Sequence, residues 1–169
     1  MDQLIELYQY RLFRYLCHLT GSREHAEDFF QETWIRVLER GHQYDSKWKF
    51  EAWLFTIARN LVFDWQRRKK PQSLDELMSP DTDAAGWEPS TPPEESPLQR
   101  ATQLQNDAFV QTVLGRLPVV FREVLVLRFQ EDMSLEEIAS ITRAPLSTVK
   151  SRLYRGIEAF RKLLPEDRV

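Results

Sequence analysis

Residues 134–160, SLEEIASITRAPLSTVKSRLYRGIEAF, contain two helix signals separated by a short helix breaker. The first helix is expected to open at Ser134, because Ser134 and Glu137 form an S-x-x-E capping box. Pro145 ends this helix after about two turns. A short helix, a tight turn and a longer helix make a helix-turn-helix, whose second helix enters the DNA major groove.

The second of these helices has an apolar side and a polar, basic side. Ser147 or Thr148 is expected to cap it, and Val149 and Leu153 to face inward. Its outward positions suit contact with base edges and phosphates. These outward positions are expected to be Lys150, Ser151, Tyr154 and Arg155, with Arg152 close by.

The first 70 residues carry three more helix patterns. Apolar residues recur at steps of three and four over residues 4–19, and Gly21 stops the pattern. Ser22 is expected to cap a second helix that ends near Gly41. A third helix is expected over about residues 50–70, since its apolar residues again recur at helical spacing. The sequence therefore predicts an all-α protein.

Charge divides the chain into three parts. The 169 residues carry a net charge of −3, with +2 over residues 1–71, −7 over residues 72–99 and +2 over residues 100–169. The middle part also contains five prolines and few aliphatic residues, a composition that cannot bury enough surface to fold. We predict two small helical domains, 1–71 and 100–169, joined by an acidic, proline-rich linker over residues 72–99.

Several classes of protein are excluded by motifs that the sequence lacks. None of the five glycines lies in a phosphate-binding motif, and His18, His25 and His42 lack the partners of a metal site. We therefore expect no catalytic residues, no metal and no cofactor. Cys17 is the one cysteine, Asp2 replaces the positive charge of a signal peptide, and no apolar run could span a membrane. A soluble, cytoplasmic protein is expected.

Two stretches resemble bacterial RNA polymerase sigma factors. Residues 26–70, beginning AEDFFQETW, resemble the second conserved region of that family, and residues 117–164, beginning LPVVFREVL, resemble the fourth. Their order and size match the extracytoplasmic-function (ECF) group. The resemblance implies a subunit that binds the β and β′ subunits of core RNA polymerase, directs it to −35 and −10 promoter elements and aids −10 melting. It also implies control by an anti-sigma factor, with no direct membrane insertion.

The resemblance implies that the helix over residues 26–38 docks on core polymerase. The implied contact residues are Asp28, Phe30, Gln31, Glu32, Trp34 and Arg36. Aromatic anchors among polar groups suit such an interface. The alternative for Phe30, Trp34 and Leu38 is that they pack the helical core, and the sequence leaves both interpretations open.

The loop over residues 42–49 and the helix that follows resemble the family's −10 reader. Melting a duplex requires a platform for an unstacked base and cations along the separated strand. The implied contact residues are Tyr44, Lys47, Trp48, Lys49, Arg59, Asn60, Asp64, Arg67 and Arg68. Tyr44 and Asn60 match the family's base-pocket positions. The alternative is an ordinary solvated helix face, and Trp53 is expected to lie in the core.

The last helix resembles the family's −35 reader. The implied contact residues are Thr148, Lys150, Ser151, Arg152, Tyr154 and Arg155. Gly156 departs from the more usual alanine, at a cost of about 1 kcal/mol in helix propensity, and is expected to loosen or bend this helix. The acidic linker either threads the polymerase's RNA channel, as the resemblance implies, or is a solvated spacer.

Two other classes of function remain open at the level of sequence. A stand-alone helix-turn-helix repressor or activator would use its N-terminal helices to dimerise or to sense a ligand, and would bind a palindrome without polymerase. A pure interaction protein would hold another regulator without touching DNA. In that case Lys150→Ala and Arg155→Ala would leave its activity unchanged.

Overall fold

The computed structural model describes residues 1–69 and 109–165, and all regular secondary structure in these two ranges is helical. The expected all-α class is therefore confirmed. The predicted linker, residues 72–99, lies outside the described residues. Within the described part, no helix is long and apolar enough to cross a membrane.

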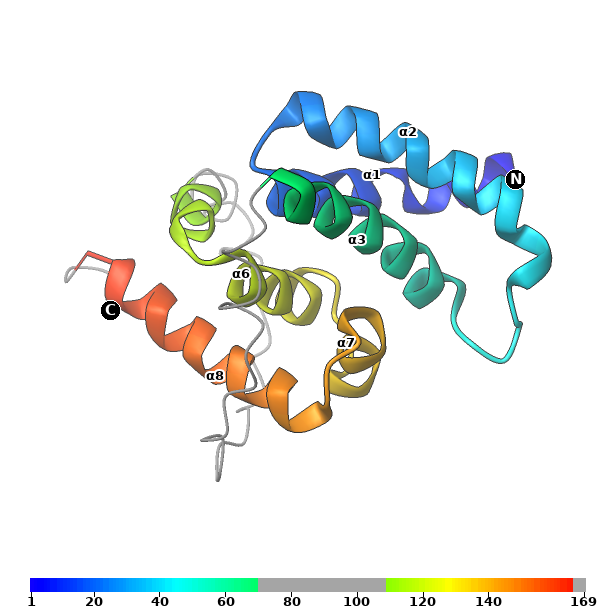
Figure 1. The fold of residues 1–169 in the computed structure, drawn as a ribbon. Helices are drawn as coiled ribbons and strands as arrows, with labels where there is room; N and C mark the ends of the chain where they lie inside the picture. Colours follow the sequence, from blue (N-terminus) through cyan, green and yellow to red (C-terminus); the bar gives the residue numbers. More distant parts are fainter. Residues whose placement is uncertain (70–108, 166–169) are drawn as a thin grey trace, which may run out of the picture.

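The N-terminal half is a bundle of the helices α1 (Asp2–Thr20), α2 (Arg23–Arg40) and α3 (Phe50–Lys69). In this bundle α2 runs antiparallel to both α1 and α3 (Figure 1). Gly21 caps α1 in the left-handed conformation, with φ 66°, where a side chain would be strained. Ser22 caps α2, and its hydroxyl accepts a hydrogen bond from a backbone N–H of the first turn. Both predicted caps are confirmed.

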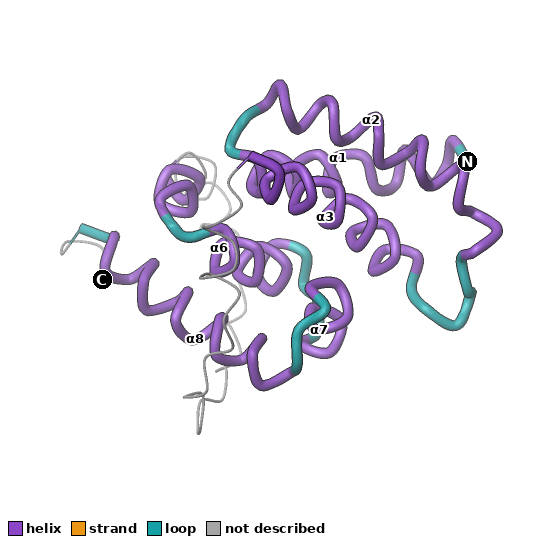
Figure 2. The backbone as a smooth tube through the Cα atoms, in the orientation of Figure 1, coloured by secondary structure: helices purple, strands orange, loops and turns teal. Residues whose placement is uncertain are grey.

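The C-terminal half contains the helix-turn-helix. It comprises a helix over residues 109–116, α6 (Val119–Leu125), the π-helical segment η2 (Val126–Gln130), α7 (Leu135–Thr142) and α8 (Leu146–Leu163). Only a short turn separates α7 from α8 (Figure 2). The predicted order of a short helix, a turn and a longer helix is confirmed.

The capping box that opens α7 is also confirmed, whereas the predicted cap of α8 is wrong. Ser134 Oγ accepts from the Glu137 N–H at 3.1 Å, and the Glu137 carboxylate accepts from the Ser134 N–H at 3.0 Å. At α8 the N-cap is Pro145 instead of Ser147 or Thr148. The fixed φ of proline, here −58°, lets Leu146 begin the helix directly, so Thr148 already lies in the first turn.

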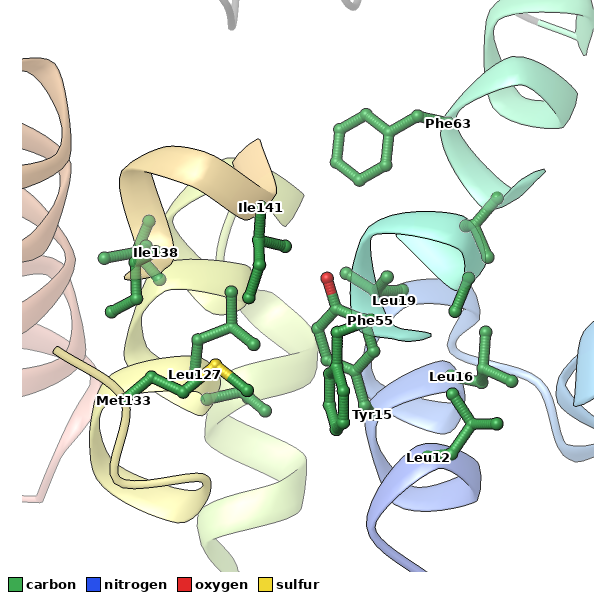
Figure 3. Close-up of a cluster of buried hydrophobic side chains, with 14 of the residues drawn as sticks. Leu12, Tyr15, Leu16, Leu19, Phe55, Phe63, Leu127, Met133, Ile138 and Ile141 are labelled. Atoms are coloured by element: carbon green, nitrogen blue, oxygen red, sulfur yellow. The ribbon is translucent and has the colours of Figure 1, made fainter. Parts of the chain in front are cut away.

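The two halves pack against each other. α3 lies on α7 and α1 lies on α6. Figure 3 shows Tyr15 and Phe55 from the first half facing Leu127 and Met133 from the second. All four side chains are less than 2% exposed. The sequence divides the chain by composition and gives no sign of this shared core.

Gly156 lies where α8 crosses α6, and α8 continues through it without a break. A Cβ atom at this position would lie 3.3 Å from Leu125 Cγ and 3.4 Å from Phe121 Cβ. The missing side chain therefore lets the two helices approach closely. This packing role was not indicated by the sequence, which suggested only a loosened helix.

Candidate nucleic-acid interface

The loop between α2 and α3 presents one large aromatic side chain to solvent. It begins with a 3-10 turn over Gly41–Gln43. The Tyr44 ring packs on Phe50 and Trp53, with centroid distances of 5.6 and 5.2 Å, and its hydroxyl donates to the Trp48 carbonyl at 2.7 Å. These contacts hold the loop in shape. The Trp48 side chain, 66% exposed, is left facing outward.

Lys49, at the end of this loop, forms an ion pair with the other half of the protein. Its Nζ lies 2.5 Å from Glu137 Oε1 in α7. The hydrogen bond to Glu137 raises the pKa of Lys49. Burial acts to raise the pKa of Glu137, but the bonds from Lys49 and from the Ser134 N–H outweigh it, and the pKa is lowered. Lys49 is expected to track a DNA strand, yet here it is paired within the protein.

Arg59 is buried between the two halves. Only 4% of it is exposed, and its Nε donates to Glu123 Oε1 in α6 at 2.5 Å. Glu123 is fully buried and also accepts from the Tyr15 hydroxyl at 3.1 Å. The guanidinium stacks on Phe63, 4.1 Å from the ring centroid. In this arrangement Arg59 is held by Glu123 and Phe63, and little of it is exposed.

The other residues expected to read the −10 element lie along α3 and the preceding loop. Asn60 is half-buried, while Lys47, Asp64, Arg67 and Arg68 are exposed. Arg67 and Asp64 lie one turn apart, with Nη1 and Oδ1 separated by 4.0 Å. The structure thus brings Asn60, Asp64 and Arg67 together on one side of α3, as the spacing predicts.

Two buried carboxylates that the sequence analysis did not single out help to join the halves. Glu131 accepts from Arg11 Nε at 2.7 Å and from Arg14 Nη2 at 3.0 Å. Glu123 pairs with Arg59, as described above. The position of Glu123 could have been found from the sequence, because it lies one helical turn after Val120 within the apolar run of α6. A charge at such a position requires a buried partner.

Among the residues expected to bind polymerase, the aromatic ones lie in or against the core. Trp34 is 7% exposed, and the Phe30 ring packs edge-on against Phe13 at 6.0 Å. The core interpretation therefore holds for Trp34. Asp28 and Gln31 are exposed, while Glu32 and Arg36 form an ion pair at 3.0 Å across one helical turn. These polar residues remain predicted polymerase contacts.

The recognition helix α8 exposes fewer of the predicted residues than expected. Tyr154 is 36% exposed, and a hydrogen bond to Glu158 raises its pKa. Lys150 and Arg155 are partly exposed. The prediction that Ser151 faces outward is wrong, since it is 2% exposed.

Thr148 and Arg152 are also buried, at 5% and 6% exposure. The physical reason is that α8 packs on both α6 and α7, which covers more of its circumference than a single apolar stripe would. Of the residues predicted to contact the −35 element, only Lys150, Tyr154 and Arg155 are exposed or partly exposed on α8.

No group of three or more His, Cys, Asp or Glu side chains within residues 1–69 and 109–165 could hold a metal ion. The expected absence of a metal centre or cofactor stays a prediction for the chain as a whole.

Comparison with known proteins identifies the family. Residues 4–72 match the family model of sigma-70 region 2, and residues 110–160 match that of sigma-70 region 4. The ECF RNA polymerase sigma factor SigW of Bacillus subtilis is 33% identical over 95% of this chain and 87% of SigW. SigE of Mycolicibacterium smegmatis, another ECF sigma factor, is 34% identical over 96% of this chain and 61% of SigE.

The fold agrees with two solved structures, the first of which is a sigma factor. RpoE of Bartonella quintana, solved with the anti-sigma factor NepR, is similar with a TM-score of 0.71, at 24% identity over 99% of this chain and 98% of RpoE. CnrH, solved with the cytosolic domain of CnrY, is similar with a TM-score of 0.65, at 23% identity over 96% and 85% of the two chains. The chain belongs to the ECF group of bacterial RNA polymerase sigma factors.

Proposed function

We propose that this sigma factor binds core RNA polymerase in the cytoplasm, reads a −35 element through α8 and reads and helps melt a −10 element through the loop and α3. The main support is that two sigma regions occur in order, and the second has a helix-turn-helix with partly exposed basic residues on one side. Lys150 and Arg155 lie on that side. The chain supplies promoter specificity, and the polymerase supplies the chemistry.

The two halves have to separate before the whole −10 surface can act. Lys49 and Arg59 are bound to Glu137 and Glu123 of the other half. Trp48, by contrast, is already exposed and suits stacking against an unpaired base. Polymerase would hold the halves apart at the spacing of the two promoter elements, so the free chain should bind DNA weakly.

We also propose control by an anti-sigma factor. One similar structure is a complex of the sigma factor RpoE with the anti-sigma factor NepR, and a second is a complex of CnrH with the cytosolic domain of CnrY. An inhibitor that bound both halves of this chain would keep Lys49 and Arg59 paired within the protein. It would add to the contacts that already hold the halves together.

The experiment that tests the function is transcription by sigma-free core polymerase on pooled genomic DNA fragments, with and without the full chain. The 5′ ends of the transcripts are then sequenced. We expect new start sites that share −35 and −10 elements at one spacing. Asn60→Ala and Arg155→Ala should each reduce these transcripts at least tenfold.

Arg23→Gln is the matched control, because Arg23 is exposed and forms an ion pair with Glu27, one helical turn away, at 3.2 Å. It should leave transcription within twofold of the unchanged protein. Transcripts that do not change when the folded protein is added would refute the proposal, and tight binding to a palindrome by a stable dimer would favour a repressor.

A further inference from the structure

A cleft of about 310 Å³ lies between α2, α3 and the end of α7. It is closed by residues of both halves, since Thr142 and Arg143 belong to the helix-turn-helix. Five arginines line it, which is an unusual concentration for so small a space. They are Arg36, Arg40, Arg59, Arg67 and Arg143.

The acidic residues near the cleft do not balance these guanidinium groups. Asp64 alone among the lining residues is acidic, and it lies 4.0 Å from Arg67. Two of the other arginines, Arg36 and Arg59, pair with glutamates that do not line the cleft. Arg40 and Arg143 are exposed, and neither has an ion pair within the described part of the chain. The cleft therefore carries a surplus of positive charge.

One buried donor of a lining residue has no partner in the described part of the chain. Arg59 is 4% exposed, its Nε is bonded to Glu123, and its Nη2 has no hydrogen-bond acceptor among residues 1–69 and 109–165. Leaving a buried donor of a charged group unpaired is unfavourable, because the group has lost its hydrogen bonds to water. An acceptor oxygen that entered the cleft beside Arg59 would remove this cost. Asn60 follows Arg59 in the sequence and also lines the cleft, where its amide can donate a further hydrogen bond.

Arg143 reaches the cleft because of how α7 ends. It adopts the left-handed conformation with φ 52°, and its N–H bonds the Ala139 carbonyl. This cap ends α7, the helix that packs on α3. A ligand held by Arg143 and by the arginines of α2 and α3 would therefore bridge the two halves.

We propose that this cleft binds phosphate oxyanions, with a diphosphate as the best-fitting small ligand. Guanidinium groups bind phosphate through paired, charge-assisted hydrogen bonds, and several of them converge here. Ile57, Leu61 and Phe63 form the apolar part of the lining, which strengthens such bonds by excluding water. The bound anion stabilises the packed arrangement of the two halves. The cleft shares Asn60 and Arg67 with the proposed −10 surface, but its test is separate from that function, because the titration needs neither polymerase nor a promoter.

The test is calorimetric titration of the full chain with inorganic pyrophosphate at fixed ionic strength. We compare the unchanged protein with Arg40→Gln and Arg143→Gln, since neither residue is assigned to DNA or polymerase. Each variant should weaken binding at least fivefold. The control Arg23→Gln, which removes a charge outside the cleft, should change it less than twofold.

A second titration, with a short single-stranded oligonucleotide, distinguishes the source of the phosphate. Binding of pyrophosphate that depends on Arg40 and Arg143 identifies a small anion as a ligand. Binding of the oligonucleotide alone, with the same dependence, supports the site and identifies nucleic-acid phosphates as the source. Equal binding by all variants, or no binding of either probe at millimolar concentration, overturns the proposal.

Discussion

His18 is a titratable residue whose environment opposes its charged form. It lies on α1, 4% exposed, and its Nε2 is 3.0 Å from Gln130 Oε1 in the other half. Burial lowers its pKa to about 4; the bond to Gln130 acts to raise it, and Arg122 and Arg14 lower it further. The neutral imidazole is therefore part of the packed structure, and protonation favours unfolding or separation of the halves.

This gives a pH-dependent stability with a defined direction. The unfolded chain binds the proton near pH 6.5 and the folded chain only near pH 4, so stability falls as pH decreases through this window. Between pH 7 and pH 5 the loss due to His18 should be about 2 kcal/mol. His18→Gln, which keeps a hydrogen-bonding group, should lack this loss. Urea unfolding of both proteins at the two pH values measures the difference, and identical losses would contradict the assignment to His18.

At the scale of the element, the contact between α6 and α8 sets the position of the recognition helix. Gly156 allows that contact, as a Cβ there would already meet Leu125 and Phe121 at 3.3–3.4 Å. Gly156→Leu should lower the free energy of unfolding by about 2 kcal/mol, because overpacking outweighs the gain in helix propensity. Gly115→Leu is the control, since no atom lies within 4 Å of a Cβ there. Denaturant unfolding of both variants tests this, and equal stabilities would contradict the close-packing argument.

The sequence predicts helices well where a local rule decides the structure. The capping box at Ser134, the left-handed Gly21 and the N-cap Ser22 act within a few residues, and each is found as expected. The start of α8 was mispredicted because Pro145 competes with two hydroxyl residues for the same role. Burial of Ser151 depends on two neighbouring helices, which no local pattern encodes.

For the candidate site, the sequence predicts which residues carry the right chemistry but not their partners. Trp48 is exposed and Asn60 faces a cleft, in line with their expected roles. Lys49 and Arg59 have the expected charge, yet they bind carboxylates more than 60 residues away in the chain. Contacts at such separations depend on the packing of whole helices. The composition of the chain instead predicts two separate domains, and so it gives no indication of these contacts.

At the scale of the whole molecule, the halves are joined by an apolar core with a buried ion pair inside it. Arg59 and Glu123 are 4% and 0% exposed, and the Tyr15 hydroxyl bonds the same carboxylate. A buried pair of this kind contributes little compared with an apolar substitute, but removing one partner is costly because the other charge stays buried. The least costly response is for the halves to separate and expose Arg59 to water.

Glu123→Gln should therefore open the protein without unfolding its helices. We expect a larger radius of gyration by small-angle X-ray scattering, unchanged helical circular dichroism and a loss of about 3 kcal/mol from the packing of the halves. The double variant Arg59→Met with Glu123→Leu should recover most of the compactness, since it removes both charges. Glu27→Gln, which breaks an exposed pair with Arg23, should change neither measurement. A Glu123→Gln protein as compact and stable as the unchanged chain would mean that the apolar core alone holds the halves together.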